Sequence, residues 1–339
     1  MTALPPCVYF QKLAARLKSG VAVVCFFGGI MLTQAQTEYT ADGEPSAIEE
    51  EIRWLLNRAR FDRARENALR GTSYTDIPAS TGPVAPNALL LRSSRHHSED
   101  MARKNVFQHK TVNGSLFYNP ATHPNPWDRM TAEGYVWNMA AENIAAGYAS
   151  ALSVHVGWWK STGHRLNMGG KDMCEIGNGY HYRAGTTYVE YYTMNLGRSG
   201  NNRFFTGTIF DDTNGNRAYS RNEGRGGIRV DLAAGGLNHS WCDVSTSVGS
   251  FAIPLDGISA GTEVHVLLTN TNPGAVALSL PRDYDTLEKF VLGPGESRVW
   301  GKFTRDASDS ATPLPFWPIW RRHPCRAFTV MRRHPLPWR

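Results

Sequence analysis

The chain has 339 residues, which is enough for two ordinary domains with hydrophobic cores. Its formal charge of +6 comes from the two ends, because three cations precede residue 36 and six arginines lie from Arg321 onward, which leaves residues 36–320 at a net −3. The basic ends therefore do not indicate nucleic-acid binding by the folded part. The five cysteines include one in each proposed domain, Cys174 and Cys242, and they do not suggest a disulfide framework.

Residues 1–35 have the three parts of a secretory signal peptide. Three lysine and arginine side chains come first, "VAVVCFFGGIML" follows as a short apolar run, and small residues precede a cleavage point after Ala35. The apolar run is too short to be a stable transmembrane anchor. The sequence therefore predicts a secreted or periplasmic protein that is not an integral membrane protein after signal cleavage, with a linker over residues 36–45.

Three segments of helical periodicity follow the linker. Ser46 and Glu49 have the spacing of a capping box at the start of the first segment. The apolar stripes predict helices over residues 46–68, 89–107 and 150–161. After Cys174 the chain becomes β-branched and aromatic, as strands are. Helices followed by strands indicate an α+β domain over residues 46–198.

Short strand-like runs separated by Gly, Asn and Pro fill residues 203–306. Runs such as "FFTGTIF", "GIRVDL" and "EVHVLLTN" are typical of an antiparallel β-sandwich. Residues 313–339 form a basic, proline-rich tail without acids, which predicts disorder. The sequence thus predicts two folded domains between a signal peptide and a tail.

Three side chains with possible chemistry stand out in the first domain: His109, Glu142 and His164. Two imidazoles and a carboxylate can hold zinc and leave a fourth position for water. The same groups can also act as general acid and base, or form a structural hydrogen-bond network. The sequence has no H-E-x-x-H pair and no nucleophile elbow, so the residues by themselves leave these alternatives open.

Other polar and aromatic residues of this domain fit packing roles better. His97 lies on the apolar stripe of the second helix, and Trp158 and Trp159 share the apolar face of the third. All three are therefore predicted to be core residues. Asp100 and Arg129 are expected to tie loops to helices rather than to take part in chemistry.

Five motifs carry a family resemblance: "HHSEDMARKNVFQH", "DRMTAEGY", "AENIAAGY", "GWWKSTGHRLNM" and "YYTMNLG". In order and spacing they resemble the bacterial SCP-like branch of the CAP superfamily, which includes cysteine-rich secretory proteins, antigen 5 and the plant pathogenesis-related 1 proteins. The resemblance covers about residues 46–198 and implies an α-β-α sandwich with a central cleft. It places His109, Glu142 and His164 at cleft positions that hold zinc in several members. The family often has a second acid within the stretch that reads "WWKSTG" here, and its absence weakens a complete four-residue site.

Residues 211–224, "DDTNGNRAYSRNEG", form an oxygen-rich loop in the second domain. The donors have the spacing of an EF-hand-type calcium loop: Asp212, Asn214, Asn216, the Ala218 carbonyl, Ser220 and Glu223. The flanks are strand-like and Arg217 stands where the usual glycine would be, so a true EF-hand is not expected. The run resembles the calcium-loop strands of SdrD B-like and Cna B-like surface domains, which implies an Ig-like β-sandwich stiffened by calcium. A solvated Asn/Gly turn is the alternative.

Two functions remain open. An exported binding or interaction protein would recognise an extracellular lipid, glycan or peptide through a His/Glu cleft that holds a divalent metal. A metal-assisted extracellular hydrolase would act on peptide or cell-wall material, with Glu142 as base beside His109 and His164. The missing second acid favours the binding protein, and the sequence leaves open whether the chain is an enzyme.

Overall fold

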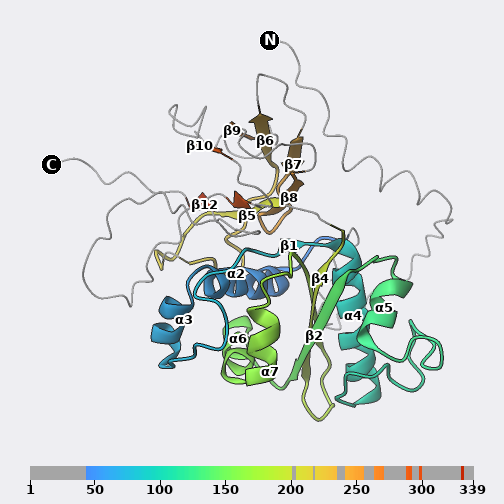
Figure 1. Cartoon of the computed structure of the whole chain (residues 1–339). Helices are drawn as coiled ribbons and strands as arrows, with labels where there is room; N and C mark the ends of the chain where they lie inside the picture. Colours follow the sequence, from blue (N-terminus) through green and yellow to red (C-terminus); the bar gives the residue numbers. More distant parts are fainter. Residues whose placement is uncertain are drawn as a thin grey trace, which may run out of the picture.

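The computed structural model describes residues 43–200, 204–216, 218–234, 241–255, 263–270, 288–291, 298–299 and 330–331. The predicted signal peptide, most of the linker and most of the basic tail lie outside these residues. Figure 1 shows an α/β part in the lower half of the view and a part made of strands above it.

The α/β part is a four-stranded sheet between two layers of helices (Figure 1). Helices α2, α6 and α7 cover one face, with α3 beside α2, and α4 and α5 cover the other. The helices are α2 (Ala47–Phe61), α3 (Arg63–Arg70), α4 (Ala88–Lys104), α5 (Pro126–Ala132), α6 (Ala151–Lys160) and α7 (Thr162–Met168). The strands are β1 (Ala85–Pro86), β2 (Met139–Ala146), β3 (Glu175–Tyr182) and β4 (Glu190–Arg198). This arrangement confirms the α-β-α sandwich that the resemblance implied.

The sheet has the order β1-β3-β4-β2, so β2 lies at one edge. β4 pairs antiparallel with both β3 and β2, while the short β1 runs parallel to β3. In the β2–β4 register Glu142 faces Asn195. The edge position of β2 brings Glu142 next to the loops that leave α4 and enter α7.

Two glycines allow α4 to pack directly on the backbone of β3. A Cβ added at Gly177 would lie 2.0 Å from the backbone nitrogen of Leu91, and one added at Gly179 would lie 2.2 Å from the carbonyl carbon of Ser94. The hydroxyls of Ser94 and Ser98 donate to the carbonyls of these glycines at 2.7 Å and 2.9 Å. These contacts fix the position of α4, and therefore the point at which the chain leaves it toward His109.

The first predicted helix begins as expected but is not continuous. The backbone N–H of Ser46 donates to the Glu49 carboxylate at 2.7 Å, which confirms the capping box. The prediction of one helix over residues 46–68 is wrong at Asp62, which is extended and ends α2. The Asp62 carboxylate accepts from the backbone N–H of Arg65 at 2.9 Å, so it caps a separate α3.

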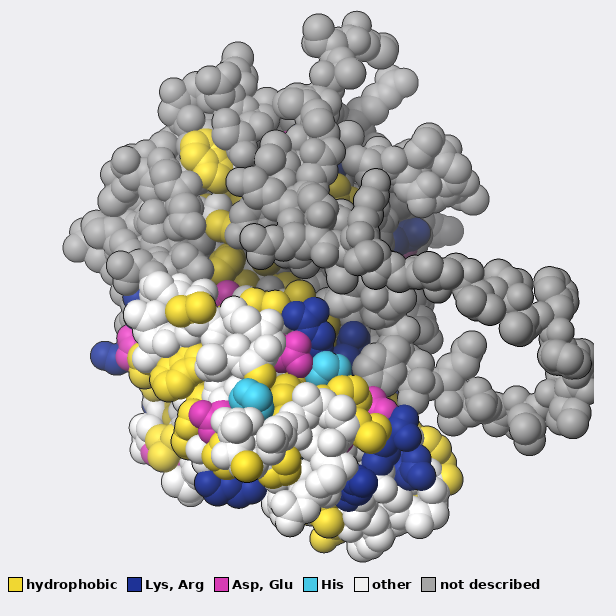
Figure 2. Space-filling model, turned by 90° about the vertical axis from the view of Figure 1, so that its right-hand side faces the viewer, with side chains coloured by type: hydrophobic (Ala, Val, Ile, Leu, Met, Phe, Trp, Pro, Cys, Tyr) yellow, Lys and Arg dark blue, Asp and Glu magenta, His cyan; other side chains and the backbone are white. Residues whose placement is uncertain are grey.

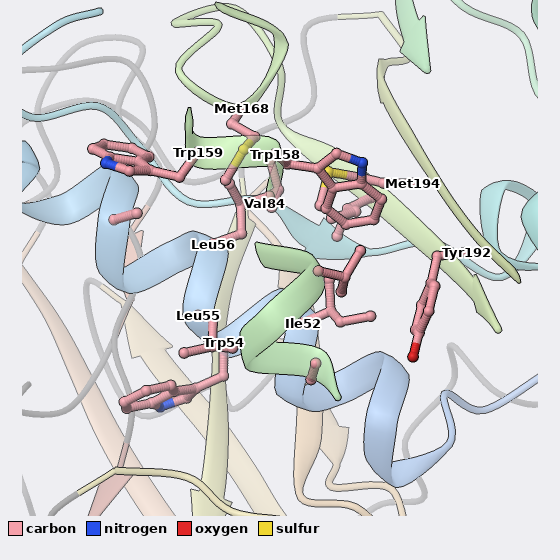
Figure 3. Packing of buried hydrophobic residues seen from close by; sticks show 14 of the residues in the cluster. Ile52, Trp54, Leu55, Leu56, Val84, Trp158, Trp159, Met168, Tyr192 and Met194 are labelled. Atoms are coloured by element: carbon pink, nitrogen blue, oxygen red, sulfur yellow. The ribbon is translucent and has the colours of Figure 1, made fainter. Parts of the chain in front are cut away.

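The hydrophobic core between α2 and the sheet contains the predicted tryptophans. Trp158 and Trp159 are buried, and Figure 3 shows them beside Leu56 and Met168. The indole N–H of Trp158 donates to the Ile144 carbonyl at 3.1 Å, so the ring is also tied to β2. The core roles predicted for both tryptophans are confirmed.

Four elements of the α/β part had no counterpart among the predictions: β1, α5, α7 and β2. Helix α5 is seven residues long and begins at Pro126, with Asn125 and Asp128 forming a capping box before it. Strand β2 contains "AENIAA", whose small residues carry little strand signal. Of these elements, α5, α7 and β2 carry most of the candidate site. The helix and strand patterns of the sequence were therefore weakest in the segments that build the site.

The strands of the second part form two sheets. Their bounds are β5 (Phe204–Phe210), β6 (Ile228–Ala234), β7 (Trp241–Val244), β8 (Ser250–Pro254), β9 (Glu263–Asn270), β10 (Glu288–Val291), β11 (Arg298–Val299) and β12 (Val330–Met331). One sheet has the order β10-β9-β6-β7, and in the other β5 pairs with β8, β11 and β12. Several predicted strands are confirmed, among them "FFTGTIF" and "EVHVLLTN". The Ig-like sandwich as a whole stays a prediction.

Two further expectations concern the pairing of the cysteines and the absence of a transmembrane helix. Cys174 is free and buried, whereas Cys242 is disulfide-bonded. The cysteine in the second part therefore has a covalent role that its spacing did not indicate. Within the described ranges, none of the helices combines the length and apolar character that crossing a bilayer requires.

The two parts meet at a buried polar contact between α2 and β5. Arg53 pairs with Glu50 at 2.5 Å and donates to the Gly207 carbonyl and the Thr208 hydroxyl, each at 3.0 Å. Both charged side chains are almost fully buried. Phe210 extends this contact into the core beneath α2. The second part is therefore docked on the helix that opens the first.

Candidate functional site

Four separate segments supply the candidate site. Glu142 lies on β2, Arg129 on α5, His164 on α7, and His109 in the loop after α4. The chain distance between His109 and His164 means that the site exists only in the folded state. The sequence motifs named three of these residues, and Arg129 is the addition that the structure makes.

Both carboxylate oxygens of Glu142 are occupied. Nδ1 of His109 lies 2.9 Å from Oε1, and a guanidinium nitrogen of Arg129 donates to Oε2 at 2.6 Å. Burial raises the pKa of Glu142, but the charges of Arg129 and His97 and the contact with His109 outweigh it and hold the pKa below its usual range. Glu142 is therefore an ionised, buried carboxylate with two committed partners.

The ionised carboxylate decides the orientation of His109. A carboxylate can only accept, so the Nδ1 of His109 carries the proton in this contact. The other ring nitrogen, Nε2, then points away from Glu142 with a free lone pair whenever the ring is neutral. The His109 side chain is 51% exposed, whereas that of Glu142 is 2% exposed. The pair thus presents an oriented imidazole nitrogen to solvent.

Arg129 holds the loop as well as the acid. Its guanidinium is fully buried and donates to the His109 carbonyl at 2.9 Å and to the Thr111 hydroxyl at 3.1 Å, in addition to Glu142. The expectation that Arg129 ties a loop to a helix is confirmed, but the residue also neutralises the central carboxylate. From the sequence, loop anchoring and a part in the site were alternatives for Arg129, and in the structure Arg129 does both.

His97 supports the same loop from below. Its Nε2 lies 2.9 Å from the Gln108 carbonyl and donates to it, one residue before His109. Burial lowers the pKa of His97 to about 4, against the attraction of Glu142, so the ring is neutral at pH 7. The predicted core position is confirmed, and this core residue also fixes the backbone that carries His109.

We expect His97 to make folding sensitive to mild acid. Its folded-state pKa lies below the ordinary value of about 6.5, so its contribution is complete above pH 6.5 and is lost as the pH falls toward 4. The full loss would be about 3 kcal/mol. Urea unfolding of the wild type and of His97→Gln, which keeps a donor for Gln108, should show a smaller decline for the variant between pH 7 and pH 4.5. Parallel declines would contradict this role.

His164 shares the electrostatic environment of His109. Burial lowers the pKa of His164, and the positive charge of His109 lowers it further. The backbone around His164 is bound to β2, since the Asn143 side chain donates to the His164 carbonyl at 3.1 Å. Asn167 in turn donates to the Asn143 side chain at 2.8 Å. The backbone that carries His164 is therefore tied to the strand that carries Glu142, and the convergence of the three predicted side chains stays a prediction.

The arrangement is better suited to an oriented histidine pair than to three metal ligands. Within the described residues, no three His, Cys, Asp or Glu side chains converge as a metal would require. His109 and His164 can each offer an imidazole nitrogen, while the Glu142 carboxylate is held by His109 and Arg129. A carboxylate that binds the far nitrogen of a histidine is the usual outer partner of a metal-binding imidazole. Glu142 fits that outer role.

The predicted calcium-loop donors lie together between β5 and β6: Asp212, Asn214, Asn216, Ala218, Ser220 and Glu223. The side-chain amides of Asn214 and Asn216 both reach the Ser220 hydroxyl, at 2.9 Å and 3.0 Å. The buried Glu223 carboxylate accepts from the backbone N–H groups of Thr213, Asn214 and Ser220. The loop is therefore closed around Ser220 and Glu223.

Comparisons with known proteins find a family match in the first part of the chain. Residues 56–196 match the model of the CAP cysteine-rich secretory protein family. The uncharacterized protein YkwD of Bacillus subtilis is 34% identical over 98 residues, which are 29% of this chain and 35% of that protein. The chain therefore spans about a third of the length of this curated relative.

Two solved structures show a similar partial match. An extracellular protein containing an SCP domain from Bacillus anthracis is 26% identical, with a TM-score of 0.32, over 44% of this chain and 40% of that one. A cysteine-rich secretory protein from Staphylococcus aureus is 15% identical, with a TM-score of 0.28, over 46% and 41%. The family match and the α-β-α sandwich agree: residues 56–196 of this chain form a CAP domain of the cysteine-rich secretory protein type.

Proposed function

We propose that the chain is an exported binding protein whose CAP domain recognises an extracellular ligand through His109 and His164. The supporting observation is the double engagement of Glu142, which orients His109 and leaves its Nε2 toward solvent. Export is supported by the signal-like N-terminus and by the wording used for the Bacillus anthracis relative, which is described as extracellular.

The same observation weighs against the hydrolase that has Glu142 as general base. A general base needs a carboxylate oxygen within reach of the proton that it removes. Here both oxygens are engaged and the pKa of Glu142 is lowered, which makes it a weaker base. His109, in contrast, keeps an imidazole nitrogen that the contact with Glu142 does not use. The binding role therefore fits the observed contacts of Glu142, whereas the hydrolase would require one of these contacts to break.

A divalent cation such as zinc would be held by the two imidazoles. His109 and His164 supply two nitrogen donors, and water or the ligand would complete the coordination. A bound cation would act as a Lewis acid toward an oxygen of the ligand. Glu142 and Arg129 would fix the tautomer and the backbone of His109. A site with two protein ligands should bind zinc more weakly than a closed structural site.

Zinc titration of the full chain tests the cleft. We expect His109→Ala and His164→Ala each to remove most of the calorimetric signal, because each deletes one of two donors. Glu142→Gln should weaken binding by about 10–100-fold, as expected of an outer partner. His123→Ala, in the loop before α5, is the matched control and should bind as the wild type does. Undiminished binding by the double histidine variant would show that the metal lies elsewhere.

We further propose that the loop over residues 212–223 binds calcium. Ser220 and Glu223 already face the interior of the loop. The side-chain oxygens of Asn214 and Asn216 accept from the backbone N–H groups of Asn216 and Ala218, and each would use its second lone pair for a bound cation. Asp212 and Glu223 are the two acids of the set, so the affinity should be that of an extracellular module rather than of a cytosolic sensor.

Calcium should raise the thermal midpoint of the full chain. Binding to the folded state stabilises it by about 2.7 kcal/mol at a hundredfold excess over Kd. We expect EDTA to lower the midpoint by a few degrees and excess calcium to restore it, as followed by scanning calorimetry. Glu223→Gln should abolish the shift, whereas Asp172→Asn, which removes a partly exposed acid elsewhere, should retain it. Coincident melting curves with and without calcium would leave the loop as a plain Asn/Gly turn.

A further inference from the structure

The loop over residues 212–223 also contacts the first part of the molecule. Tyr219 is 3% exposed and belongs to the same hydrophobic cluster as Ile52 and Trp54 of α2. Its ring meets that of Phe210 edge to face, with the centroids 5.6 Å apart, and the Phe210 ring meets that of Trp54 in the same way at 6.4 Å. A row of three aromatic rings therefore runs from the loop into the core beneath α2.

The buried ring is a stronger anchor than the ion pair at the edge of this contact. Arg221 pairs with Glu51 of α2 at 3.2 Å, but the arginine side chain is 41% exposed, and such a pair contributes little. Figure 2 shows acidic side chains next to basic ones at several places on the described surface, so opposite charges side by side do not by themselves mark a docking contact. The docking of the loop therefore depends on Tyr219 rather than on Arg221.

Tyr219 lies between two of the proposed calcium donors, the Ala218 carbonyl and the Ser220 hydroxyl. The backbone N–H of Ala218 donates to the Asn216 side chain at 2.7 Å. The backbone N–H of Ser220 donates to the Glu223 carboxylate at 2.8 Å. The segment that carries Tyr219 is thus held on both sides by other members of the donor set. Placing its ring beneath α2 also places the backbone of both neighbouring donors.

A ring held in the core should favour calcium binding. The docked loop has already lost conformational freedom that the ion would otherwise have to restrict, and such preorganisation raises affinity. The coupling is reciprocal, because an ion that binds the docked loop more tightly must stabilise docking by the same factor. Couplings between two sites change an affinity by about 5–150-fold.

We propose that calcium in the 212–223 loop strengthens the docking of the second part on α2, with Tyr219 as the residue that couples the two events. This inference rests on the calcium binding proposed above and adds a regulation to it. In a calcium-rich medium the two parts would be held as one unit, and in a calcium-poor medium they would be held more loosely. The Tyr219 hydroxyl has no hydrogen-bond partner among the described residues, so the ring acts through packing.

Calorimetric calcium titration of the full chain tests the coupling. Tyr219→Ser should lower the calcium affinity about tenfold, although it removes a side chain that is not a donor. Tyr219→Phe should bind as the wild type does, because it keeps the packing. Tyr191→Ser empties a buried position in a different cluster of the first part and should also bind as the wild type does. This control separates the coupling from a general loss of stability, and thermal melts check that each variant is folded.

Hydrogen exchange of the wild type gives a second readout that needs no substitution. Relative to EDTA, calcium should slow amide exchange in the 212–223 loop and in α2, and it should leave the segment 110–125 between α4 and α5 unchanged. Slower exchange in the loop alone would overturn the coupling and leave the calcium proposal standing. No slowing in either segment would overturn both proposals. Equal calcium affinity in a folded Tyr219→Ser and the wild type would also overturn the coupling.

Discussion

Arg129→Met should lower the free energy of unfolding by about 3–5 kcal/mol, as expected when one partner of a buried ion pair is removed. Arg129 and Glu142 are both buried, and the substitution would leave an ionised carboxylate facing an apolar side chain. It would also deprive the His109 carbonyl of its donor. Urea unfolding measures the loss, and zinc titration should show that the folded fraction binds more weakly because His109 is no longer held.

Two variants control this experiment. Arg198→Met removes an arginine whose ion pair is partly exposed and long, so it should cost less than about 1 kcal/mol. Glu142→Gln combined with Arg129→Met removes the buried charge and should recover part of the stability. If Arg129→Met were as stable as Arg198→Met, the buried pair would not be the central support of the cleft.

Arg53→Met should cost a similar amount, about 3–5 kcal/mol, at the contact between the two parts of the molecule. The substitution would leave the buried Glu50 carboxylate without its arginine partner, and it would remove the donor to the Gly207 carbonyl and the Thr208 hydroxyl. Because these acceptors lie on β5, the loss should fall on docking as well as on α2. Scanning calorimetry of the full chain should show a lower midpoint and a broader or split transition.

The rim of the same contact offers a matched control. Arg221 pairs with Glu51 across the contact, but its side chain is 41% exposed. Arg221→Met should therefore cost less than about 1 kcal/mol. A single sharp transition in Arg53→Met, at the wild-type midpoint, would mean that the two parts are held together by other contacts. Since Arg221 belongs to the proposed calcium loop, its variant should also retain the calcium-dependent shift.

The sequence could not distinguish two roles for Glu142, and the contacts of its carboxylate in the structure do. As a direct ligand or base it would need a free oxygen, and as an orienting group it would need a histidine partner. The contacts at 2.9 Å to His109 and 2.6 Å to Arg129 favour the second role. The candidate site is therefore built around an oriented imidazole, with the buried acid bound to it.

Local patterns in the sequence determined much of the scaffold. The Ser46–Glu49 capping box, the buried stripe of α4 with His97, and the buried pair Trp158 and Trp159 all follow from spacing of a few residues. Such features are readable because a helix repeats every 3.6 residues and brings near neighbours in the chain to one face. The strands β3 to β6 and β9 followed from their β-branched and aromatic composition.

Only the tertiary structure decided the partners of the buried charges. Nothing near Arg129 in the sequence indicates that it binds Glu142 and the His109 carbonyl, nor that Arg53 of α2 reaches β5. The helix α5 that carries Arg129 is short, and the strand β2 that carries Glu142 has a weak strand pattern, so their placement depends on contacts with the rest of the sheet. The folded backbone decides which charged residues of distant segments form an ion pair. The spacing of charged residues along the sequence does not indicate their partners.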